Sequence, residues 1–160
     1  MGYFLWFLPY QSKTNSDSVK LYQNPILRIQ FAYPGNWQPK LDGLIQGYPT
    51  QYNGPNGFFV INAIAGQKDL PETIRDICKK DADIFGSNPT ITECINNSRL
   101  GYYIYPGPDC PINELHPACF VTQLRNPIYY NGQPCSILMV FSDEQHLNEI
   151  ISTLEPYYPS

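Results

Sequence analysis

The clearest pattern of hydrophobic positions lies in the last third of the chain, between Cys119 and Leu154. An apolar run leads to the dipeptide Asn131-Gly132, and a second run, Ile137 to Phe141, follows it. Asn-Gly between hydrophobic runs predicts a β-hairpin, because a type I′ turn needs positive φ at both central positions. The second run is apolar at every position, so both faces of that strand are expected to be covered.

The segment Phe58 to Ala65 has the same two-sided apolar character, and it is also expected to lie centrally in a sheet. The turn-rich stretch Pro49 to Gly57 in front of it is predicted to be a loop. Shorter or alternating apolar runs predict further strands at 25–33, 43–48, 90–96 and 99–105. The last two are joined by a tight turn around Asn97-Ser98.

Two amphipathic helices are available to cover this sheet. The first is predicted over 70–86, with Asp69 as N-cap and Glu72 at the capping-box position. The second is predicted over 143–154, with Ser142 as its cap. The fold class is therefore expected to be α/β (α+β), with a mainly antiparallel sheet of about six or seven strands sandwiched by helices.

The N-terminal stretch Tyr3 to Tyr10, YFLWFLPY, is strongly apolar but shorter than a membrane span needs. Two interpretations fit it: the outer end of a transmembrane helix, with the polar run 11–20 as tether, or a segment packed on the domain. We accordingly divide the chain into an apolar segment with its polar tether, 1–20, and a single domain, 21–160.

Charge and cysteine content narrow the function classes. The 160 residues carry a net charge of −4 and no basic stripe, which argues against nucleic-acid binding. Five cysteines leave at least one thiol unpaired. Cys78 and Cys135 fall on apolar patterns typical of small buried residues. Cys110 and Cys119 flank one loop, where a local disulfide is easy to form, and we predict that bridge.

No catalytic or metal-binding motif stands out. Cys110, Glu114, His116 and Cys119 share a loop but lack the paired cysteines of a structural zinc site, so no metal and no cofactor are assigned. His146 lies three residues after Asp143 and three before Glu149, where a histidine is usually solvated. A His–carboxylate base remains the alternative, but no nucleophile motif accompanies it. No catalytic residue is assigned.

Aromatic residues gather at predicted strand ends and loops. They can line a binding groove, or they can be cross-strand pairs and loop anchors. The predicted contact surface consists of Trp37, Tyr48, Tyr52 and Tyr105, because binding residues tend to lie on loops held by a rigid sheet. The other aromatic residues of this pattern are Tyr102, Tyr103, Tyr129 and Tyr130. Asn96-Asn97-Ser98 also matches an N-glycosylation acceptor, a pattern common by chance.

Three stretches together resemble the PsbP-like fold group: FAYPGNW from Phe31, NGFFVINAIAG from Asn56, and FSDEQHLNEIISTL from Phe141. The resemblance covers roughly 21–154, and it is closest to bacterial extracytoplasmic domains that are membrane-tethered or carried by lipoproteins. It implies an antiparallel sheet between helices and a role as an interaction module without a common active site. The five cysteines and the proline-rich loop 106–118 depart from that pattern, so no partner can be transferred.

The expected function is a non-catalytic, extracytoplasmic binding or sensing module associated with a membrane protein in the cell envelope. Its expected partner is a protein or a cell-envelope ligand, and a membrane tether is expected upstream. Two alternatives remain: a small hydrolase that uses His146 or His116 with a carboxylate, or a purely structural spacer.

Overall fold

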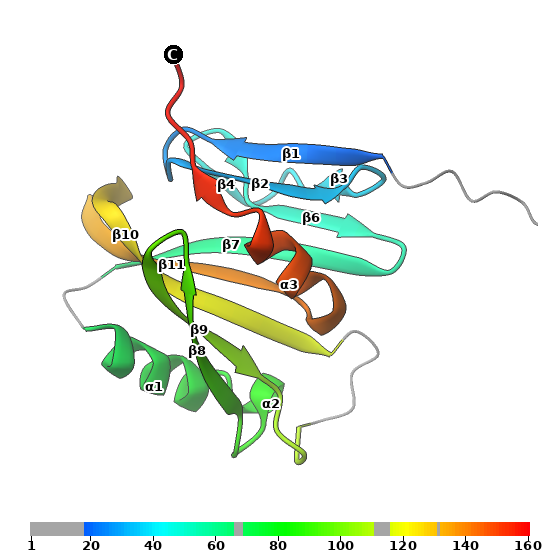
Figure 1. Ribbon diagram of the computed structural model, residues 1–160, viewed down its shortest axis with the longest axis vertical. Helices are drawn as coiled ribbons and strands as arrows, with labels where there is room; N and C mark the ends of the chain where they lie inside the picture. Colours follow the sequence, from blue (N-terminus) through cyan, green and yellow to red (C-terminus); the bar gives the residue numbers. More distant parts are fainter. Residues whose placement is uncertain (1–17, 66–68, 111–115, 131) are drawn as a thin grey trace, which may run out of the picture.

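The structure is a computed structural model that describes residues 18–65, 69–110, 116–130 and 132–160. Its elements follow one another along the chain as shown in Figure 1. The first half contains β1 (Val19–Asn24), β2 (Ile29–Pro34), β3 (Gln38–Pro39), β4 (Leu44–Ile45), β5 (Tyr48–Pro49), β6 (Gln51–Gly54) and β7 (Gly57–Ala65). The second half contains α1 (Leu70–Lys80), α2 (Ala82–Phe85), β8 (Thr90–Asn96), β9 (Arg99–Tyr105), β10 (Pro117–Tyr130), β11 (Gln133–Asp143), α3 (Glu144–Ser152) and β12 (Glu155–Pro156).

The main sheet has seven antiparallel strands in the order β3-β6-β7-β11-β10-β9-β8. Both strands with two-sided apolar sequences, β7 and β11, have neighbours on either side, with Val140 opposite Ile61. Strands β10 and β11 form the predicted hairpin, in which Tyr130 pairs with Gln133 and Gly132 has a positive φ of 73°. Asn131, the other turn residue, lies outside the described residues. The predicted central positions of β7 and β11 are confirmed.

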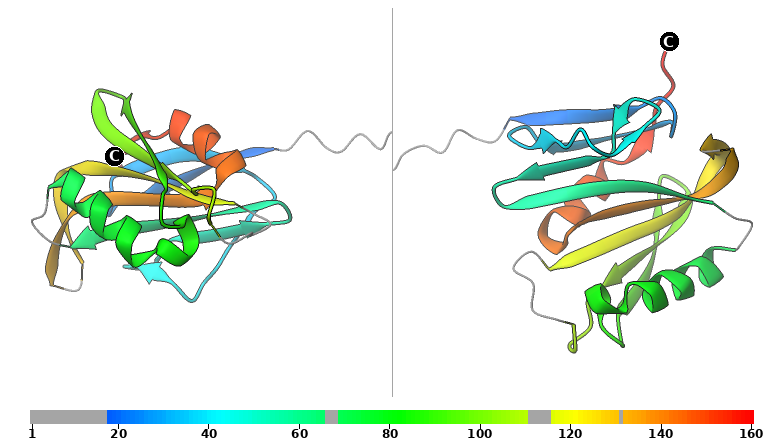
Figure 2. Two further views of the ribbon diagram at one scale, coloured as in Figure 1. Left: turned by 90° about the horizontal axis from the view of Figure 1, so that it is seen from below. Right: turned by 180° about the vertical axis from the view of Figure 1, so that it is seen from behind.

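Different layers cover the two faces of this sheet. Helices α1 and α2 pack on one face, whereas α3 and a three-stranded sheet, β1-β2-β12, pack on the other. The view from below places α1 and α3 on opposite sides (Figure 2). The α3-side core includes Phe31, Trp37, Phe59, Leu138 and Ile150, and the α1-side core consists of Ile74, Ile77, Phe85, Ile104, Cys119, Val121 and Ile137. The predicted α/β fold class, with helices on both faces of an antiparallel sheet, is confirmed.

The small sheet joins segments from the two ends of the described chain. β2 lies in the middle, paired with β1 over its whole length and with the two-residue strand β12. β1 begins at Val19, inside the run predicted to be a polar tether. Its inner face carries Tyr22 and Asn24, and both side chains are buried in the core. The apolar segment 3–10 lies outside the described residues. Among the helices described, none is long and apolar enough to cross a membrane.

Several local predictions are wrong. The first residues of the predicted strand 25–33 form a turn in front of β2, and the predicted helix over 70–86 is divided at Asp81 into α1 and α2. The predicted loop over 49–57 contains β6, which pairs with β7 so that Gly54 lies opposite Gly57 across a tight turn. The cap of α3 is Asp143 and not Ser142: its carboxylate accepts the N–H of His146. Ser142 instead donates its hydroxyl to the carbonyl oxygen of Phe58, 2.7 Å away, because it still belongs to β11.

Candidate functional site

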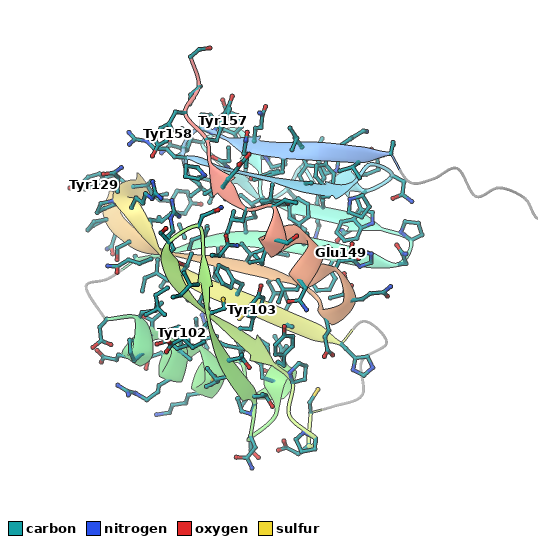
Figure 3. The ribbon with its side chains drawn as sticks, in the orientation of Figure 1. Tyr102, Tyr103, Tyr129, Glu149, Tyr157 and Tyr158 are labelled. Carbon is teal, nitrogen blue, oxygen red and sulfur yellow. The ribbon has the colours of Figure 1, made fainter. Side chains whose placement is uncertain are left out.

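A groove of about 560 Å³ runs between β2 and α3 on the surface of the α3 side. We call it the α3 groove. Its walls combine apolar and polar side chains, and Glu149 lies on the exposed side of α3 (Figure 3). The lining residues are Val19, Ala32, Tyr33, Pro34, Asn56, Gln145, His146, Glu149, Ile150, Ser152 and Thr153. This mixture is typical of a ligand-binding cleft.

His146 enters this groove from the first turn of α3, with only 7% of its surface exposed. Its ring Nδ1 lies 2.5 Å from Oδ2 of Asp143, and the same oxygen accepts the backbone N–H of His146 at 3.1 Å. The other oxygen, Oδ1, accepts the N–H of Phe58 at 3.1 Å. Asp143 therefore caps α3, anchors β7 and orients the imidazole at once.

Trp37 supports the inner side of the His146 ring. The two rings meet edge to face with centroids 4.9 Å apart, and Trp37 is only 1% exposed. A Cβ at Gly54 would lie 2.0 Å from the Trp37 ring, and one at Gly57 would lie 2.5 Å from it and 2.8 Å from His146 Nδ1. The β6–β7 turn can therefore close over this cluster only because glycine occupies both positions. Trp37 Nε1 has no hydrogen-bond partner among the described residues.

The His146–Asp143 pair has the arrangement of a general base, since the carboxylate fixes the ring and leaves Nε2 as the second nitrogen. Catalysis by this pair needs a nucleophile or a water site next to the ring. Besides Tyr33, two hydroxyl-bearing residues line the groove, and both bond to the end of α3 instead: Ser152 donates to the carbonyl of Glu149 at 2.7 Å. Thr153 donates to Ile150 at 3.0 Å. Within the described residues, no side-chain nucleophile is hydrogen-bonded to His146.

The second histidine and the loop with Cys110, Glu114, His116 and Cys119 are less informative. His116 is exposed, has a positive φ of 42°, and its carbonyl accepts the N–H of Glu144 at 2.8 Å, so its backbone ties down the start of α3. Glu114 lies outside the described residues. Across the described ranges, no group of three or more histidine, cysteine or acidic side chains is placed to hold a metal ion.

Cys119 is a free thiol with no exposed surface, and it lies in the α1-side core. Burial raises the pKa of this thiol, and the nearby Cys78 raises it further. Cys110 is half-buried in the turn after β9. A bridge from Cys110 to Cys119 is not part of this structure and stays a prediction. Mass spectrometry after alkylation without reductant decides it, because five alkylated cysteines would exclude the bridge.

The four residues of the predicted aromatic surface do not lie together. Trp37 is in the core, and Tyr52 stacks on Phe59 with ring centroids 4.8 Å apart. Tyr48 is exposed on β5. Tyr105 is half-buried next to α3, where its hydroxyl donates to Asn148 Oδ1 at 3.2 Å. Most of this set therefore packs as ring pairs within the fold, and a binding role for them stays a prediction.

The remaining tyrosines divide between the two sheet faces and the surface. Tyr102 and Tyr103 point to opposite faces of β9 (Figure 3). Tyr103 stacks with Tyr105, and burial raises the pKa of Tyr103 to about 12. Tyr129 is 70% exposed, and Tyr130 packs partly against the α3-side core. These residues do not extend the α3 groove.

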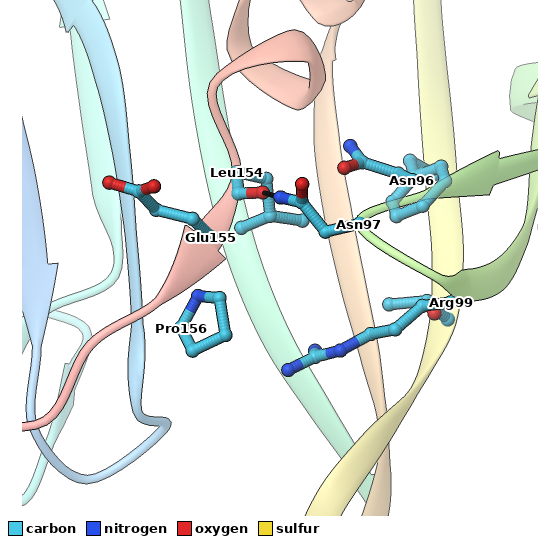
Figure 4. Close-up of a pocket in the computed structure, with 8 residues that line it drawn as sticks. Asn96, Asn97, Arg99, Leu154, Glu155 and Pro156 are labelled. Carbon is cyan, nitrogen blue, oxygen red and sulfur yellow. Dashed lines mark hydrogen bonds between the residues drawn. The ribbon is translucent and has the colours of Figure 1, made fainter.

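The candidate glycosylation site lies in a turn that holds the end of α3. Asn97 and Ser98 have positive φ values of 48° and 63°, as a two-residue hairpin turn requires. The Asn96 amide donates to the carbonyl of Ile151, and the Asn97 amide donates to that of Leu154 at 2.6 Å. Figure 4 shows the contact between Asn97 and Leu154. Because the Asn96 amide is already used inside the fold, its position does not favour glycan attachment.

A small hollow next to this turn has a volume of about 10 Å³, enough for one water molecule. Arg99 extends along it toward Pro156 (Figure 4). Arg99 Nε is buried without a hydrogen-bond partner among the described residues, and burial lowers the pKa of this guanidinium. A single water at this point would satisfy the Nε–H. The hollow is too small to be a binding site for a larger ligand.

Sequence reasoning missed the way in which this site is built. It noted His146 between two carboxylates but took the residue to be solvated, whereas a ring from the 35–37 turn covers it. Aspartate is among the strongest N-cap residues, so the sequence Ser142-Asp143 did offer a signal for the true cap. The paired Asn-Gly dipeptides at 53–54 and 56–57 likewise pointed to a tight β6–β7 turn.

Comparison with known proteins places this architecture in the PsbP-like fold class. No family model and no curated protein sequence matches the chain. Among solved structures, it is similar to cyanobacterial PsbP (CyanoP) from Synechocystis sp. PCC 6803, with a TM-score of 0.55 and 15% sequence identity. That match covers 91% of this chain and 96% of the other.

A protein from Bacteroides thetaiotaomicron VPI-5482 matches with a TM-score of 0.47 and 17% identity. The match covers 86% of this chain and 48% of that protein, so this chain spans about half of its length. At these identities the similarity to CyanoP concerns the fold alone.

Proposed function

We propose that this chain is a non-catalytic binding module that works outside the cytoplasm, at the cell envelope, and that the α3 groove is its binding site. The observation that carries the proposal is the groove itself, whose polar wall is held in one geometry by Asp143 and Trp37. A preformed cleft with few, fixed polar groups is suited to binding, because little conformational entropy is lost when a ligand enters.

Two observations favour binding over hydrolysis. Both oxygens of Asp143 accept hydrogen bonds that hold α3 and β7 in place. The His146–Asp143 pair is therefore explained by its role in the fold, without a catalytic role. The hydroxyls of Ser152 and Thr153 are committed to carbonyls at the end of α3. A spacer domain is the other alternative, and a groove of this size does not favour it.

The location outside the cytoplasm is supported by the PsbP-like fold and by the sequence resemblance to extracytoplasmic domains. The apolar segment 3–10 followed by a polar run supports a membrane tether. The partner we propose is a protein or a cell-envelope ligand, because the chain has no basic surface pattern for nucleic acid.

The test compares two double variants in a thermal-shift screen of peptides and cell-wall glycans, followed by pull-down with the intact chain. Gln145→Ala/Glu149→Ala removes two exposed polar side chains of the groove. Asp83→Ala/Gln123→Ala removes the same two types of group, also exposed, away from it. Exposed substitutions of this kind cost within about 0.5 kcal/mol, so both variants should fold.

We expect the groove variant to weaken a detected interaction at least tenfold and the control to leave it unchanged. Equal binding by both variants would place the site elsewhere, and binding by none of the proteins would favour the spacer. A parallel assay with ester and peptide substrates should show no turnover that disappears in His146→Ala. Turnover that does depend on His146 would contradict the non-catalytic assignment.

A further inference from the structure

A second surface, separate from the α3 groove, is formed by the hairpin β8–β9 at one edge of the main sheet. Within the described residues the sheet ends at β8, whose outer N–H and C=O groups have no neighbouring strand. The opposite edge strand, β3, has only two residues and contains Pro39. β8 is seven residues long and mostly exposed. The β3 edge is therefore well protected against the addition of another strand, whereas the β8 edge is much more open to it.

Exposed apolar side chains gather on one face of this hairpin. Ile91 is 46% exposed, Ile95 is 77% exposed, and Leu100, directly opposite Ile95 on β9, is 45% exposed. Side chains alternate along a strand, so Ile91, Glu93 and Ile95 share one face. It is the face that carries Ile104 and the α1-side core, but α1 and α2 pack on β10 and leave the tip of the hairpin open.

Exposed edges of natural sheets are usually protected against added strands by charged side chains, prolines, bulges or short length. Apart from a single charge, β8 has none of these features: it pairs with β9 in regular register from Thr90 to Asn96 and contains neither lysine nor proline. Its one charged residue is Glu93, at the centre of the strand, which accepts a hydrogen bond from the Tyr102 hydroxyl at 3.3 Å. The single charge at the centre of this edge disfavours most added strands but favours one that brings the opposite charge to that position.

We propose that the β8 edge binds an extended segment of a partner protein in which a lysine or arginine is flanked, two positions away on each side, by apolar residues. Main-chain hydrogen bonds would add the segment to the sheet as an outer strand. Its basic residue would lie opposite Glu93, and its apolar residues would lie opposite Ile91 and Ile95. The chain's net charge of −4 also favours a basic segment.

A second copy of this chain is the less favourable occupant. Antiparallel pairing of two β8 strands about their centre would place the two Glu93 carboxylates directly opposite each other, which is destabilising in a sheet. Two chains that each carry a charge of −4 also repel at long range. Self-association is therefore an outcome that the test must separate from peptide binding.

The probe is the blocked peptide Thr-Val-Thr-Lys-Thr-Val-Thr, and its matched control has glutamate in place of the lysine. NMR titration of the full chain should show chemical-shift changes at β8 and β9 with the lysine peptide, and binding at least tenfold weaker with the glutamate peptide. Glu93→Lys should reverse this preference. The reversal depends on charge pairing at one position, which a general loss of structure would not produce.

Ile95→Lys should abolish binding of both peptides, because it places a protective charge on the edge. Leu21→Lys is its control, since Leu21 is 59% exposed on β1, an edge strand of the other sheet. Equal binding of both peptides, shifts away from β8, or no binding would overturn the proposal. So would a dimer in analytical ultracentrifugation that Ile95→Lys dissociates. None of these outcomes depends on the α3 groove, so the two proposals can fail separately.

Discussion

The two faces of the main sheet are built in different ways. On the α3 side, rings from three segments of the chain meet around Phe59, which contacts Tyr22, Phe31, Tyr33, Trp37 and Tyr52 with centroid distances from 4.8 to 6.2 Å. The α1-side core is smaller and mainly aliphatic, and Phe85 is its one fully buried ring. Aromatic pairs add stabilisation beyond their buried area, so the α3 side is expected to be the more stable one.

Polar contacts reinforce the same difference. On the α3 side, the fully buried Asn24 accepts the N–H groups of Ile26 and Leu27, and the Asn97 amide holds the end of α3. The Asn24 contacts hold the turn that follows β1, whereas the Asn97 contact joins two segments that are 57 residues apart in the chain. On the α1 side, the contacts of the helix cap are local, from Asp69 to Glu72 and Thr73. We therefore expect α1 to open locally before the α3 side does.

The largest expected effect comes from a substitution at the centre of the aromatic cluster. Phe59→Ala should lower the free energy of unfolding by about 4 kcal/mol, because it removes a fully buried ring and leaves a cavity among other rings. Ile77→Ala, on α1, should cost about 2 kcal/mol because that residue borders the surface at 7% exposure. Urea unfolding followed by fluorescence measures both. An equal or larger loss for Ile77→Ala would contradict the proposed difference between the faces.

A smaller difference is expected between the caps of the two long helices. Asp143→Ala should cost about 2–3 kcal/mol, because the half-buried N–H of Phe58 and the buried His146 ring lose their partner along with the cap. Asp69→Ala, which removes the exposed cap of α1, should cost about 1 kcal/mol. Thermal or urea unfolding of the two variants tests this. Similar costs would show that the His146–Asp143 contact adds little to the fold.

The smallest effect concerns alkaline pH. Burial raises the pKa of Tyr22 to about 12, and its hydroxyl lies between the Asn24 amide and the carbonyl of Pro49, each 2.9 Å away. The unfolded chain ionises this tyrosine near its ordinary pKa of about 10, so unfolding becomes easier as the pH rises from about 10 toward 12. Below pH 10 this contribution to stability is fully present.

Between about pH 8 and pH 11, the wild type should therefore lose about 1 kcal/mol more stability than Tyr22→Phe does. Tyr129→Phe, which removes an exposed hydroxyl, is the matched control and should follow the wild type. Urea unfolding across this pH range provides the measurement. A parallel decline of all three proteins would mean that Tyr22 does not contribute to the alkaline sensitivity.

The parts of the fold that could be predicted from sequence are those encoded locally. β7 and β11 were placed at the centre of the sheet because both faces of their runs, 58–65 and 137–141, carry apolar residues, and α1 was predicted from its capping residues Asp69 and Glu72. The strands β1, β3, β6 and β12 were missed. β12 has two residues and exists only because β2 offers it a partner more than a hundred residues earlier in the chain.

The candidate site depended even more on distant contacts. The α3 groove exists because α3 packs against β2, and nothing in the sequence around His146 specifies that neighbour. Trp37 was expected on the surface as a loop residue beside the sheet, yet its ring lies inward against Phe59. The charge at Glu93 was visible in the sequence, but its central place on an open edge required the strand order.

The pairing of β2 with both β1 and β12 has a consequence for biosynthesis. The first strands of the domain are made early, yet their sheet acquires its third strand only when residues 155 and 156 have been synthesised. Contacts of such long sequence separation form slowly, because a large loop must close first. Until then β2 has an unpaired edge, so an emerging chain would remain open to chaperones and proteases at least until residues 155 and 156 are available. Truncation after α3 should for this reason prolong that exposure rather than remove a dispensable tail.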